Sequence, residues 1–319
     1  MRKVLITGGT GFLGSHLTKR IIDEVESVTI ATTSIRQQTT LKTLGVDIDK
    51  INLVKGDVRD FDFVRLLFNE YEFDTVFHLG AISEVVKCQS DPKLAFDVNI
   101  GGTVNILEVA RTYGNVKAVV VSSSDKAYGT GDRLPYEEDD KLNGKGTYEA
   151  SKSCTDLIAR AYATNYDLPV VVTRCSNLYG AADMNFTRLI PNNIKKIING
   201  EKPVIWKGSE GSTREFLYVE DAVDAYVSLV KNIDKTKGNA YNVGSGEKVT
   251  VRNLLCDLLF VMDSELGIDY VKKDMPEITH QYLDSSKIKK DTGWFARTPL
   301  IIGLEKTVEI YKELLWSVS

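Results

Sequence analysis

The fold follows from one stretch near the start of the chain, Lys3-Val4-Leu5-Ile6-Thr7-Gly8-Gly9-Thr10-Gly11-Phe12-Leu13-Gly14. The residues at 3–7 are mostly aliphatic and β-branched, which predicts a short buried strand. Residues 15–24 then carry apolar side chains at helical spacing, so the glycines stand between a strand and a helix. Glycines at 8, 11 and 14 allow a tight turn, a close approach of the backbone to a pyrophosphate, and tight packing of helix on strand. The stretch therefore predicts a dinucleotide-binding βαβ unit.

The same alternation of strand and helix continues through the first half of the chain. Further strands are expected at 27–31, 51–55, 75–79, 116–121 and 170–173, and helices at 61–71, 91–111 and 148–166. This order predicts an α/β fold, a doubly wound parallel sheet of the Rossmann type. Residues 1–180 would form the NAD(P)-binding domain, rejoined by about 215–245. Residues 181–214 and 246–319 would form a smaller C-terminal α/β lobe that binds the substrate, with a polar loop at 208–216.

The expected helix at 91–111 contains an unusual glycine pair, and the expected strand at 75–79 contains a histidine. Gly101 and Gly102 are adjacent in the helix interior, where each costs roughly 1 kcal/mol relative to alanine, so we expect a close approach of another segment there. His78 lies on a strand covered on both sides and is interpreted as a core residue with satisfied hydrogen bonds.

The ends of the expected strands carry the candidate cofactor contacts. A carboxylate for the adenosine ribose would stand about 20 residues after the glycines, but the chain reads Thr32-Thr33-Ser34-Ile35-Arg36 there. Hydroxyls with an arginine favour a 2′-phosphate, and hence NADP over NAD; the alternative is a solvated loop. Asp57 would accept from the adenine amino group or, alternatively, cap the next helix. The residues expected at the cofactor are Gly8, Gly11, Phe12, Leu13, Gly14, Thr32, Ser34, Arg36, Asp57, Val58, Leu79, Gly80, Ala81, Asn99, Ser122, Tyr148 and Lys152.

A second stretch, from Ser122 to Lys152, carries the catalytic candidates. Ser122-Ser123-Ser124-Asp125-Lys126 follows a strand at the edge of the sheet where parallel α/β proteins bind ligands. Tyr148 and Lys152 are four apart and share one helix face. A free tyrosine has a pKa of roughly 10, which a neighbouring ammonium and an oxidised nicotinamide would lower. The alternatives are an ordinary helix-surface pair for Tyr148 and Lys152, and a solvated ion pair for Asp125 and Lys126, worth about 0–1 kcal/mol.

Composition limits the classes of partner. The 319 residues include 40 Lys and Arg against 44 Asp and Glu, a formal net charge of −4 with both signs interspersed, which is not typical of proteins that bind nucleic acid or anionic membranes. The first residues enter a glycine-rich turn too early for a signal peptide, and no apolar run approaches the ~20 residues that span a bilayer. The four cysteines have no metal-ligand spacing. We expect a soluble, reduced, cytoplasmic enzyme without a metal.

Motifs spread over the whole chain together resemble the extended short-chain dehydrogenase/reductases: the glycine loop at 7–14, Asp57-Val58, His78-Leu79-Gly80-Ala81, Asn99, Ser124 and Tyr148-xxx-Lys152. Asn177, Arg214 and Tyr218-Val219-Glu220-Asp221 resemble the substrate half of the nucleotide-sugar epimerases and dehydratases in that family. The pair Asp125-Lys126 is similar to the CDP-glucose 4,6-dehydratases, whereas 4-epimerases usually carry small or apolar residues at this place.

The resemblance implies a homodimer that acts on a nucleotide-diphosphate sugar with bound NAD or NADP. Tyr148 would take the proton of the sugar 4-hydroxyl as hydride leaves C4, and Ser124 would hydrogen-bond the same oxygen. Asp125 would protonate the departing 6-hydroxyl, and Lys126 would act as the base or as a charge that tunes Asp125. Substrate contacts are expected from Ser83, Ser124, Asn177 and Arg214. The alternative is a 4-epimerase, which would need neither Asp125 nor Lys126.

Overall fold

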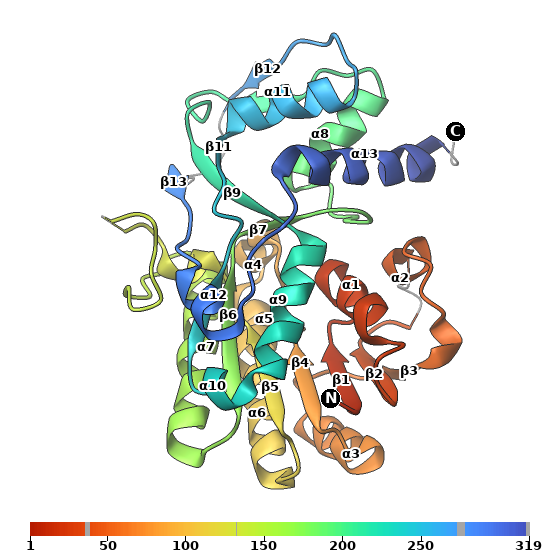
Figure 1. The fold of residues 1–319 in the computed structure, drawn as a ribbon, viewed down its shortest axis with the longest axis vertical. Helices are drawn as coiled ribbons and strands as arrows, with labels where there is room; N and C mark the ends of the chain where they lie inside the picture. The colour runs from red at the N-terminus through yellow and green to blue at the C-terminus, as the bar shows by residue number, and fades with distance from the viewer. Residues whose placement is uncertain (36–38, 132, 273–277, 317–319) are drawn as a thin grey trace.

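A seven-stranded parallel sheet forms the centre of the protein, seen in a computed structural model that describes residues 1–35, 39–131, 133–272 and 278–316 (Figure 1). The strand order is β10-β6-β5-β4-β1-β2-β3. The bounds are β1 Lys3–Thr7, β2 Ser27–Thr32, β3 Ile51–Lys55, β4 Thr75–His78, β5 Ala118–Ser122, β6 Val170–Cys175 and β10 Ala240–Val243. Because the order reverses between β1 and β4, the loops that follow these two strands diverge and leave a crevice. The Rossmann-type sheet predicted from the sequence is confirmed.

Helices cover both faces of the sheet, which explains why its strands are apolar on both sides. Val4 and Ile6 of β1 belong to one buried cluster, and Leu5 belongs to the other. The first face is covered by α1 Phe12–Ile21, α2 Thr39–Thr43, α9 Val219–Lys231 and α12 Ser286–Thr292. The second face is covered by α3 Phe61–Tyr71, α6 Gly102–Tyr113 and α7 Thr147–Tyr166. Three shorter helices complete this part: α4 Val85–Ser90, α5 Pro92–Phe96 and α10 Ile233–Thr236.

The remaining elements form a second lobe with a buried cluster of its own, drawn above the sheet in Figure 1. Its strands are β7 Asn177–Tyr179, β8 Val204–Trp206, β9 Thr213–Tyr218, β11 Lys248–Thr250, β12 Asp269–Val271 and β13 His280–Gln281. Strand β9 pairs with β7, β11 and β13, and β12 pairs with β8. The helices are α8 Leu189–Ile198, α11 Val251–Val261 and α13 Leu300–Trp316. Strand β10 pairs with β6 in the large sheet, but the domain boundaries themselves stay a prediction.

The helix expected at 91–111 is confirmed as one helical run, in which α5 is followed without a break by a π-helical turn over Asp97–Gly101 and then by α6. Two other expectations about local structure were wrong in part, one about its glycines and one about a loop. Only one of its glycines has the close neighbour that we expected: a Cβ on Gly102 would lie 2.6 Å from Val58 Cγ2, while one on Gly101 would meet nothing within 4 Å. The polar loop expected at 208–216 contains the start of β9, because a polar segment can become a strand when neighbours on both sides pair with it.

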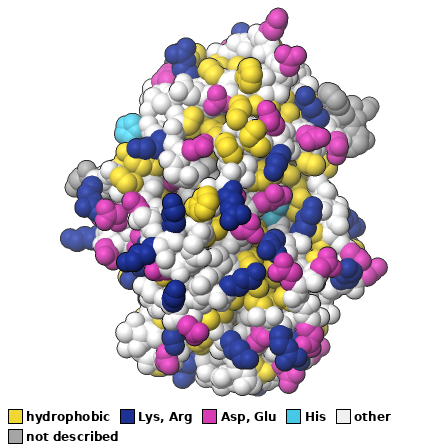
Figure 2. Space-filling view, in the orientation of Figure 1, with side chains coloured by type: hydrophobic (Ala, Val, Ile, Leu, Met, Phe, Trp, Pro, Cys, Tyr) yellow, Lys and Arg dark blue, Asp and Glu magenta, His cyan; other side chains and the backbone are white. Residues whose placement is uncertain are grey.

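The surface carries both signs of charge. Figure 2 shows Lys and Arg side chains interspersed with Asp and Glu over this face, with apolar side chains between them. Among the residues that the structure describes, no helix has both the length and the apolar composition to cross a membrane.

Candidate active site

A cavity of about 1000 Å³ lies between the carboxyl ends of the strands and the second lobe. This size is at the upper end of the range for small-molecule sites. Most of the predicted site residues line it: Gly8, Gly11, Phe12, Leu13, Gly14, Thr32, Asp57, Val58, Leu79, Gly80, Ala81, Ser83, Ser122, Ser124, Asp125, Lys126, Tyr148, Lys152, Asn177 and Arg214. Residues far apart in the sequence therefore face one space.

Three predicted cofactor contacts are not placed in this lining. Asn99 is buried behind it, where Oδ1 accepts from Ile82 N at 2.7 Å and Nδ2 donates to Ser151 Oγ at 2.9 Å. Asn99 thus holds the backbone of Ile82, beside Ser83, and is absent from the cavity lining. Ser34 is also absent from the lining, and Arg36 lies outside the described residues.

The glycine loop has the shape that a pyrophosphate requires. Gly8 has a φ of +70°, and a Cβ there would lie 2.9 Å from Gly80 N. A Cβ on Gly14 would lie 2.3 Å from Gly8 O. Helix α1 begins at Phe12, and its N-cap residue Gly11 makes no side-chain cap hydrogen bond, so the first amides and the positive end of the helix dipole are available to an anion. The residues present therefore fit the diphosphate of a dinucleotide.

Asp57 lines the cavity but already has a partner. Its Oδ2 accepts from Arg59 Nη2 at 2.7 Å, and this hydrogen bond lowers the pKa of the Asp57 carboxyl. The alternative role as a helix cap is wrong, since Asp60 caps α3 by accepting from Phe63 N at 3.1 Å. Contact of Asp57 with an adenine stays a prediction.

The Ser124–Tyr128 turn follows β5 and is closely tied to its own charged groups. Ser124 caps a short 3-10 helix at Asp125–Tyr128, accepting from Lys126 N at 3.2 Å and donating to Asp125 Oδ1 at 3.1 Å. Lys126 Nζ lies 3.3 Å from Asp125 Oδ2. The side chain of Asp125 is only 3% exposed and that of Lys126 23%. The interpretation as a solvated ion pair is therefore wrong, because the carboxylate is buried at the edge of the cavity.

Tyr148 and Lys152 face the cavity from the first turns of α7. That helix begins where Glu149 Oε2 accepts from Gly146 N at 2.7 Å. Lys152 Nζ donates to the carbonyl oxygen of Ser122 at 2.7 Å, which links the helix to the end of β5. Ser123 Oγ also donates to the carbonyl oxygen of Lys152 at 3.0 Å. Helix α7 and the carboxyl end of β5 are thus held together beside the cavity.

Burial shifts the pKa values of both Tyr148 and Lys152. Burial raises the pKa of Tyr148 to about 12, opposed by its hydrogen bond with Ser124 and reinforced by the charge of Asp125. Burial also lowers the pKa of Lys152 to about 8. The protein's own groups thus shift the tyrosine in the opposite direction to the one we expected, since burial outweighs the charges near its hydroxyl.

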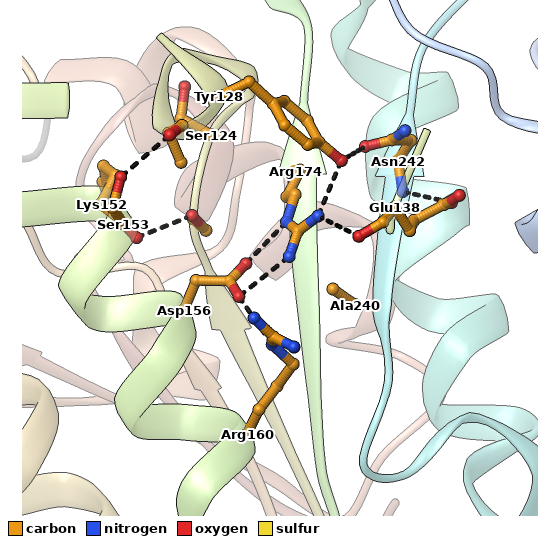
Figure 3. Close-up of polar contacts among 12 residues, drawn as sticks. Ser124, Tyr128, Glu138, Lys152, Ser153, Asp156, Arg160, Arg174, Ala240 and Asn242 are labelled. Carbon is orange, nitrogen blue, oxygen red and sulfur yellow. Dashed lines mark hydrogen bonds and ion pairs between the residues drawn. The ribbon is translucent and has the colours of Figure 1, made fainter. Parts of the chain in front are cut away.

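A buried ion pair between Arg174 and Asp156 joins strand β6 to helix α7 (Figure 3). Arg174 of β6 donates to Asp156 of α7 from Nε at 2.7 Å and from Nη2 at 3.0 Å. Its Nη1 donates to the Tyr128 hydroxyl at 2.7 Å, and this hydroxyl donates to Asn242 Oδ1 at 2.7 Å. Ser153 Oγ of α7 donates to the carbonyl oxygen of Ala127 at 2.9 Å. Helix α7 and the Ser124–Tyr128 turn are therefore fixed relative to each other.

Sequence reasoning missed several residues in the lining, among them three polar ones from distant segments. Tyr226 of α9 donates to Ser122 Oγ at 3.0 Å. Arg188 precedes α8 and pairs with the buried Asp183 at 2.9 Å. Gln281 of β13 contacts the Ser124–Tyr128 turn. None of them belongs to a local motif, and only the fold brings them to the cavity. Ser83, Asn177 and Arg214 line it as expected, with Arg214 Nη1 donating to the carbonyl oxygen of Thr279 at 2.9 Å.

Comparison with known proteins agrees with this geometry. A family model described as GDP-mannose 4,6 dehydratase matches residues 5–307. The chain belongs to this family of nucleotide-sugar dehydratases and epimerases. The family resemblance stated from the sequence is therefore confirmed, while the finer likeness to CDP-glucose enzymes stays a prediction.

Relatives that match almost the whole of this chain are named as 4,6-dehydratases. The dTDP-D-glucose 4,6-dehydratase of Homo sapiens is 30% identical over 325 residues, which cover 98% of this chain and 90% of that protein. A trifunctional enzyme of Arabidopsis thaliana, named in part as a UDP-glucose 4,6-dehydratase, is 30% identical over 320 residues. This chain covers only about half of that relative's length (47%).

Solved structures show the same two activities on one fold. The dTDP-glucose 4,6-dehydratase of Streptomyces venezuelae, solved with NAD bound, has a TM-score of 0.88 and 27% identity, covering 98% of this chain and 97% of that one. The UDP-glucose 4-epimerase of Thermotoga maritima, solved with UDP-glucose, has a TM-score of 0.89 and 25% identity, covering 98% and 99%. Since both activities occur on the fold, the site residues must distinguish them.

Proposed function

We propose that this chain is a nucleotide-sugar 4,6-dehydratase, a hydro-lyase that works with a bound nicotinamide cofactor. The observation that carries the proposal is the buried carboxylate of Asp125, which lies beside Ser124 and Lys126 at the edge of the cavity that also holds Tyr148. An epimerase has no step that needs an acid at this position. The human relative, which is named as a 4,6-dehydratase, supports the same conclusion.

The proposed reaction assigns a role to Ser124, Asp125, Lys126 and Tyr148. Gly8, Gly11 and Gly14 would hold the cofactor, which would supply a hydride acceptor for the sugar C4 and a hydride donor for C6. Tyr148 takes the proton of the 4-hydroxyl, and Ser124 hydrogen-bonds the same oxygen. The 4-ketone makes the C5 proton acidic, and Asp125 protonates the 6-hydroxyl so that it leaves as water. Lys126 acts as the base at C5 or as the charge that tunes Asp125.

NAD is the cofactor that the relatives support, since the Streptomyces venezuelae dehydratase was solved with it. The sequence-based preference for NADP depends on Ser34 and Arg36. Ser34 does not line the cavity, and Arg36 lies outside the described residues, so the preference stays unconfirmed. Gly8, Gly11 and Gly14 would hold the diphosphate of either cofactor at the start of α1.

The substrate is proposed to be a nucleotide-diphosphate sugar. Arg214 and Asn177 are assigned to its phosphates, and Ser83 to its sugar end, because all three line the cavity on the side of the second lobe or the β4 loop. Arg188, which lies beside Asp183, adds a further positive charge in this lining. The UDP-glucose bound by the Thermotoga maritima relative is consistent with this class of substrate.

A panel of sugars tests the proposal. The purified protein is incubated with UDP-, CDP-, GDP- and dTDP-linked sugars, with and without added NAD or NADP, and the products are weighed by mass spectrometry. Loss of one water from at least one substrate supports dehydration. An unchanged mass with a new stereoisomer identifies the 4-epimerase instead, which the likeness to the Thermotoga maritima enzyme keeps as the second candidate.

The proposal includes a homodimer in a reducing cytoplasm. Helix α7 leaves Leu157 54% exposed and Tyr166 57% exposed, which would supply apolar contacts to a second copy. The four cysteines that the structure describes are free, in agreement with a compartment that keeps thiols reduced. Light scattering at micromolar concentration should give twice the chain mass, and a monomer mass would contradict the dimer.

A further inference from the structure

Gln281 reaches the Ser124–Tyr128 turn from the second lobe. Its side chain is fully buried and lines the cavity. Nε2 donates to the carbonyl oxygen of Asp125 at 2.9 Å, and Oε1 accepts from Lys126 Nζ. These partners lie 155 and 156 residues away in sequence. The amide of Gln281 therefore joins strand β13 of the second lobe to the proposed dehydration residues.

The chemistry of the two partners fixes the orientation of this amide. A backbone carbonyl can only accept a hydrogen bond, and a lysine ammonium can only donate one. Only one of the two orientations of the Gln281 amide satisfies both Asp125 and Lys126. An ionised glutamate at 281 would lack the donor, and an aliphatic side chain would lack both groups.

The backbone around Gln281 is itself well anchored. Gln281 pairs with Arg214 of β9. On its other side, Tyr136 N donates to the carbonyl oxygen of Tyr282 at 3.0 Å, and Leu283 N donates to Glu215 Oε2 at 2.9 Å. The amide therefore projects from a fixed frame towards the turn.

Lys126 is the group whose freedom this contact limits. A lysine side chain loses rotamer entropy when it is held in place. Its Nζ is held between Asp125 Oδ2, at 3.3 Å, and Gln281 Oε1. The ammonium thus stays inside the cavity beside the buried carboxylate, and the second hydrogen bond of Gln281 fixes the backbone of Asp125.

We infer that Gln281 is a positioning residue for dehydration, which holds Lys126 Nζ and Asp125 as one unit facing the sugar C5–C6 bond. The role rests on the proposed function for the step at which it acts. Because both hydrogen bonds go to Asp125 and Lys126, oxidation at C4 by Tyr148 should be affected much less than elimination.

A double-mutant cycle tests the role. Gln281→Met keeps the length of the side chain and removes both hydrogen bonds, and it should lower kcat for water loss by roughly 10²-fold, the cost of misplacing a catalytic group by about 1 Å. KM should change little. In Lys126→Met the further change Gln281→Met should cost much less than it does alone, because the two residues act through one contact. Additive losses would overturn the inference.

Two further measurements keep the test decisive. Gln281→Asn retains an amide but withdraws it from Lys126, so it should also lower kcat; full activity in this variant would contradict the role. Amine-selective acetylation followed by peptide mass spectrometry should show Lys126 reacting several-fold faster in Gln281→Met, with the 84% exposed Lys93 as internal reference. Unchanged labelling of Lys126 would overturn the contact. If the wild-type protein removes water from no sugar, the proposed function fails, while the labelling still tests Gln281.

Discussion

The glycine loop after β1 closes on itself, whereas the Ser124–Tyr128 turn after β5 is closed by residues from elsewhere in the chain. In the loop, Gly11 N donates to Gly8 O at 3.0 Å, and Gly14 packs directly against Gly8. In the turn, Gln281 holds the Asp125 carbonyl and Arg174 holds the Tyr128 hydroxyl. Both segments follow parallel strands of one sheet and have internal hydrogen bonds, but the turn is also held by side chains from distant parts of the chain.

From this difference we expect the two parts of the site to tolerate change differently. The loop binds through backbone amides, so its sequence needs only glycines at fixed spacing. The turn carries side chains that must be placed to within a fraction of an ångström for chemistry, and the supports for them come from α7, β6, β10 and β13. Changes that touch the turn or its distant supports should therefore have the largest effects.

Asp125→Asn should give the largest effect and tests the chemistry of the turn. The change keeps the shape but removes the acidic proton, so water loss should fall by roughly 10²–10⁴-fold, the usual contribution of a placed general acid. Oxidation at C4 should survive, so that the ultraviolet absorbance of reduced nicotinamide rises during incubation. Asp167→Asn, on a 91% exposed side chain, is the control. Near-normal turnover in Asp125→Asn would favour the epimerase.

Arg174→Met tests the distant support of the turn through protein stability. Removing this arginine leaves the carboxylate of Asp156 buried with one fewer partner, which typically costs about 3–5 kcal/mol of unfolding free energy. Arg160→Met removes the other partner of the same carboxylate. Because the Arg160 side chain is 36% exposed, its loss should cost about 0–1 kcal/mol. Urea unfolding measures both. Equal losses would show that the buried pair does not give the turn its support.

Glu215→Gln tests the second lobe beside the turn through the pH dependence of stability. Burial raises the pKa of Glu215 to about 7, against hydrogen bonds from Gly246 N and Leu283 N. The folded state then binds this proton more strongly than the unfolded state. The stabilisation is full below about pH 4.5 and is lost as the pH rises through 7, a change of up to roughly 3 kcal/mol.

The comparison between wild type and Glu215→Gln isolates this carboxyl. Urea midpoints measured from pH 4 to 8 should fall less steeply with rising pH in the variant. A parallel decline in both proteins would show that Glu215 does not titrate in this range.

Gly14→Ala should give the smallest effect and tests the self-closing loop. The new Cβ would lie 2.3 Å from Gly8 O and 2.7 Å from Gly9 Cα, and overpacking of this kind costs about 1–3 kcal/mol. Gly101→Ala is the matched control, because its backbone is helical and nothing lies within 4 Å of the added atom; it should be neutral or stabilise by up to about 1 kcal/mol. Urea unfolding and NAD titration should separate the two, and equal results would contradict the role of Gly14.

The sequence by itself determined the sheet and the part of the cavity lining that stands at strand and helix ends. Apolar runs such as Val119–Val121 can only be buried strands, and the glycines at 8, 11 and 14 require a turn between strand and helix. Ser124, Tyr148 and Lys152 could be named because they stand at strand and helix ends, and the ends of parallel strands meet at one edge. These signals are local, so periodicity and spacing were sufficient to find them.

Tertiary structure decided what local patterns do not encode. The π-helical turn that buries Asn99, the strand that begins with the polar residues 213–215, and the pKa of Tyr148 all depend on what packs against them. Gln281 reaches Lys126 across 155 residues, and no spacing rule relates two such positions. Burial and long-range hydrogen bonds arise only when separate segments pack together, because the free energy of a charged or polar group depends on its surroundings rather than on its neighbours in sequence.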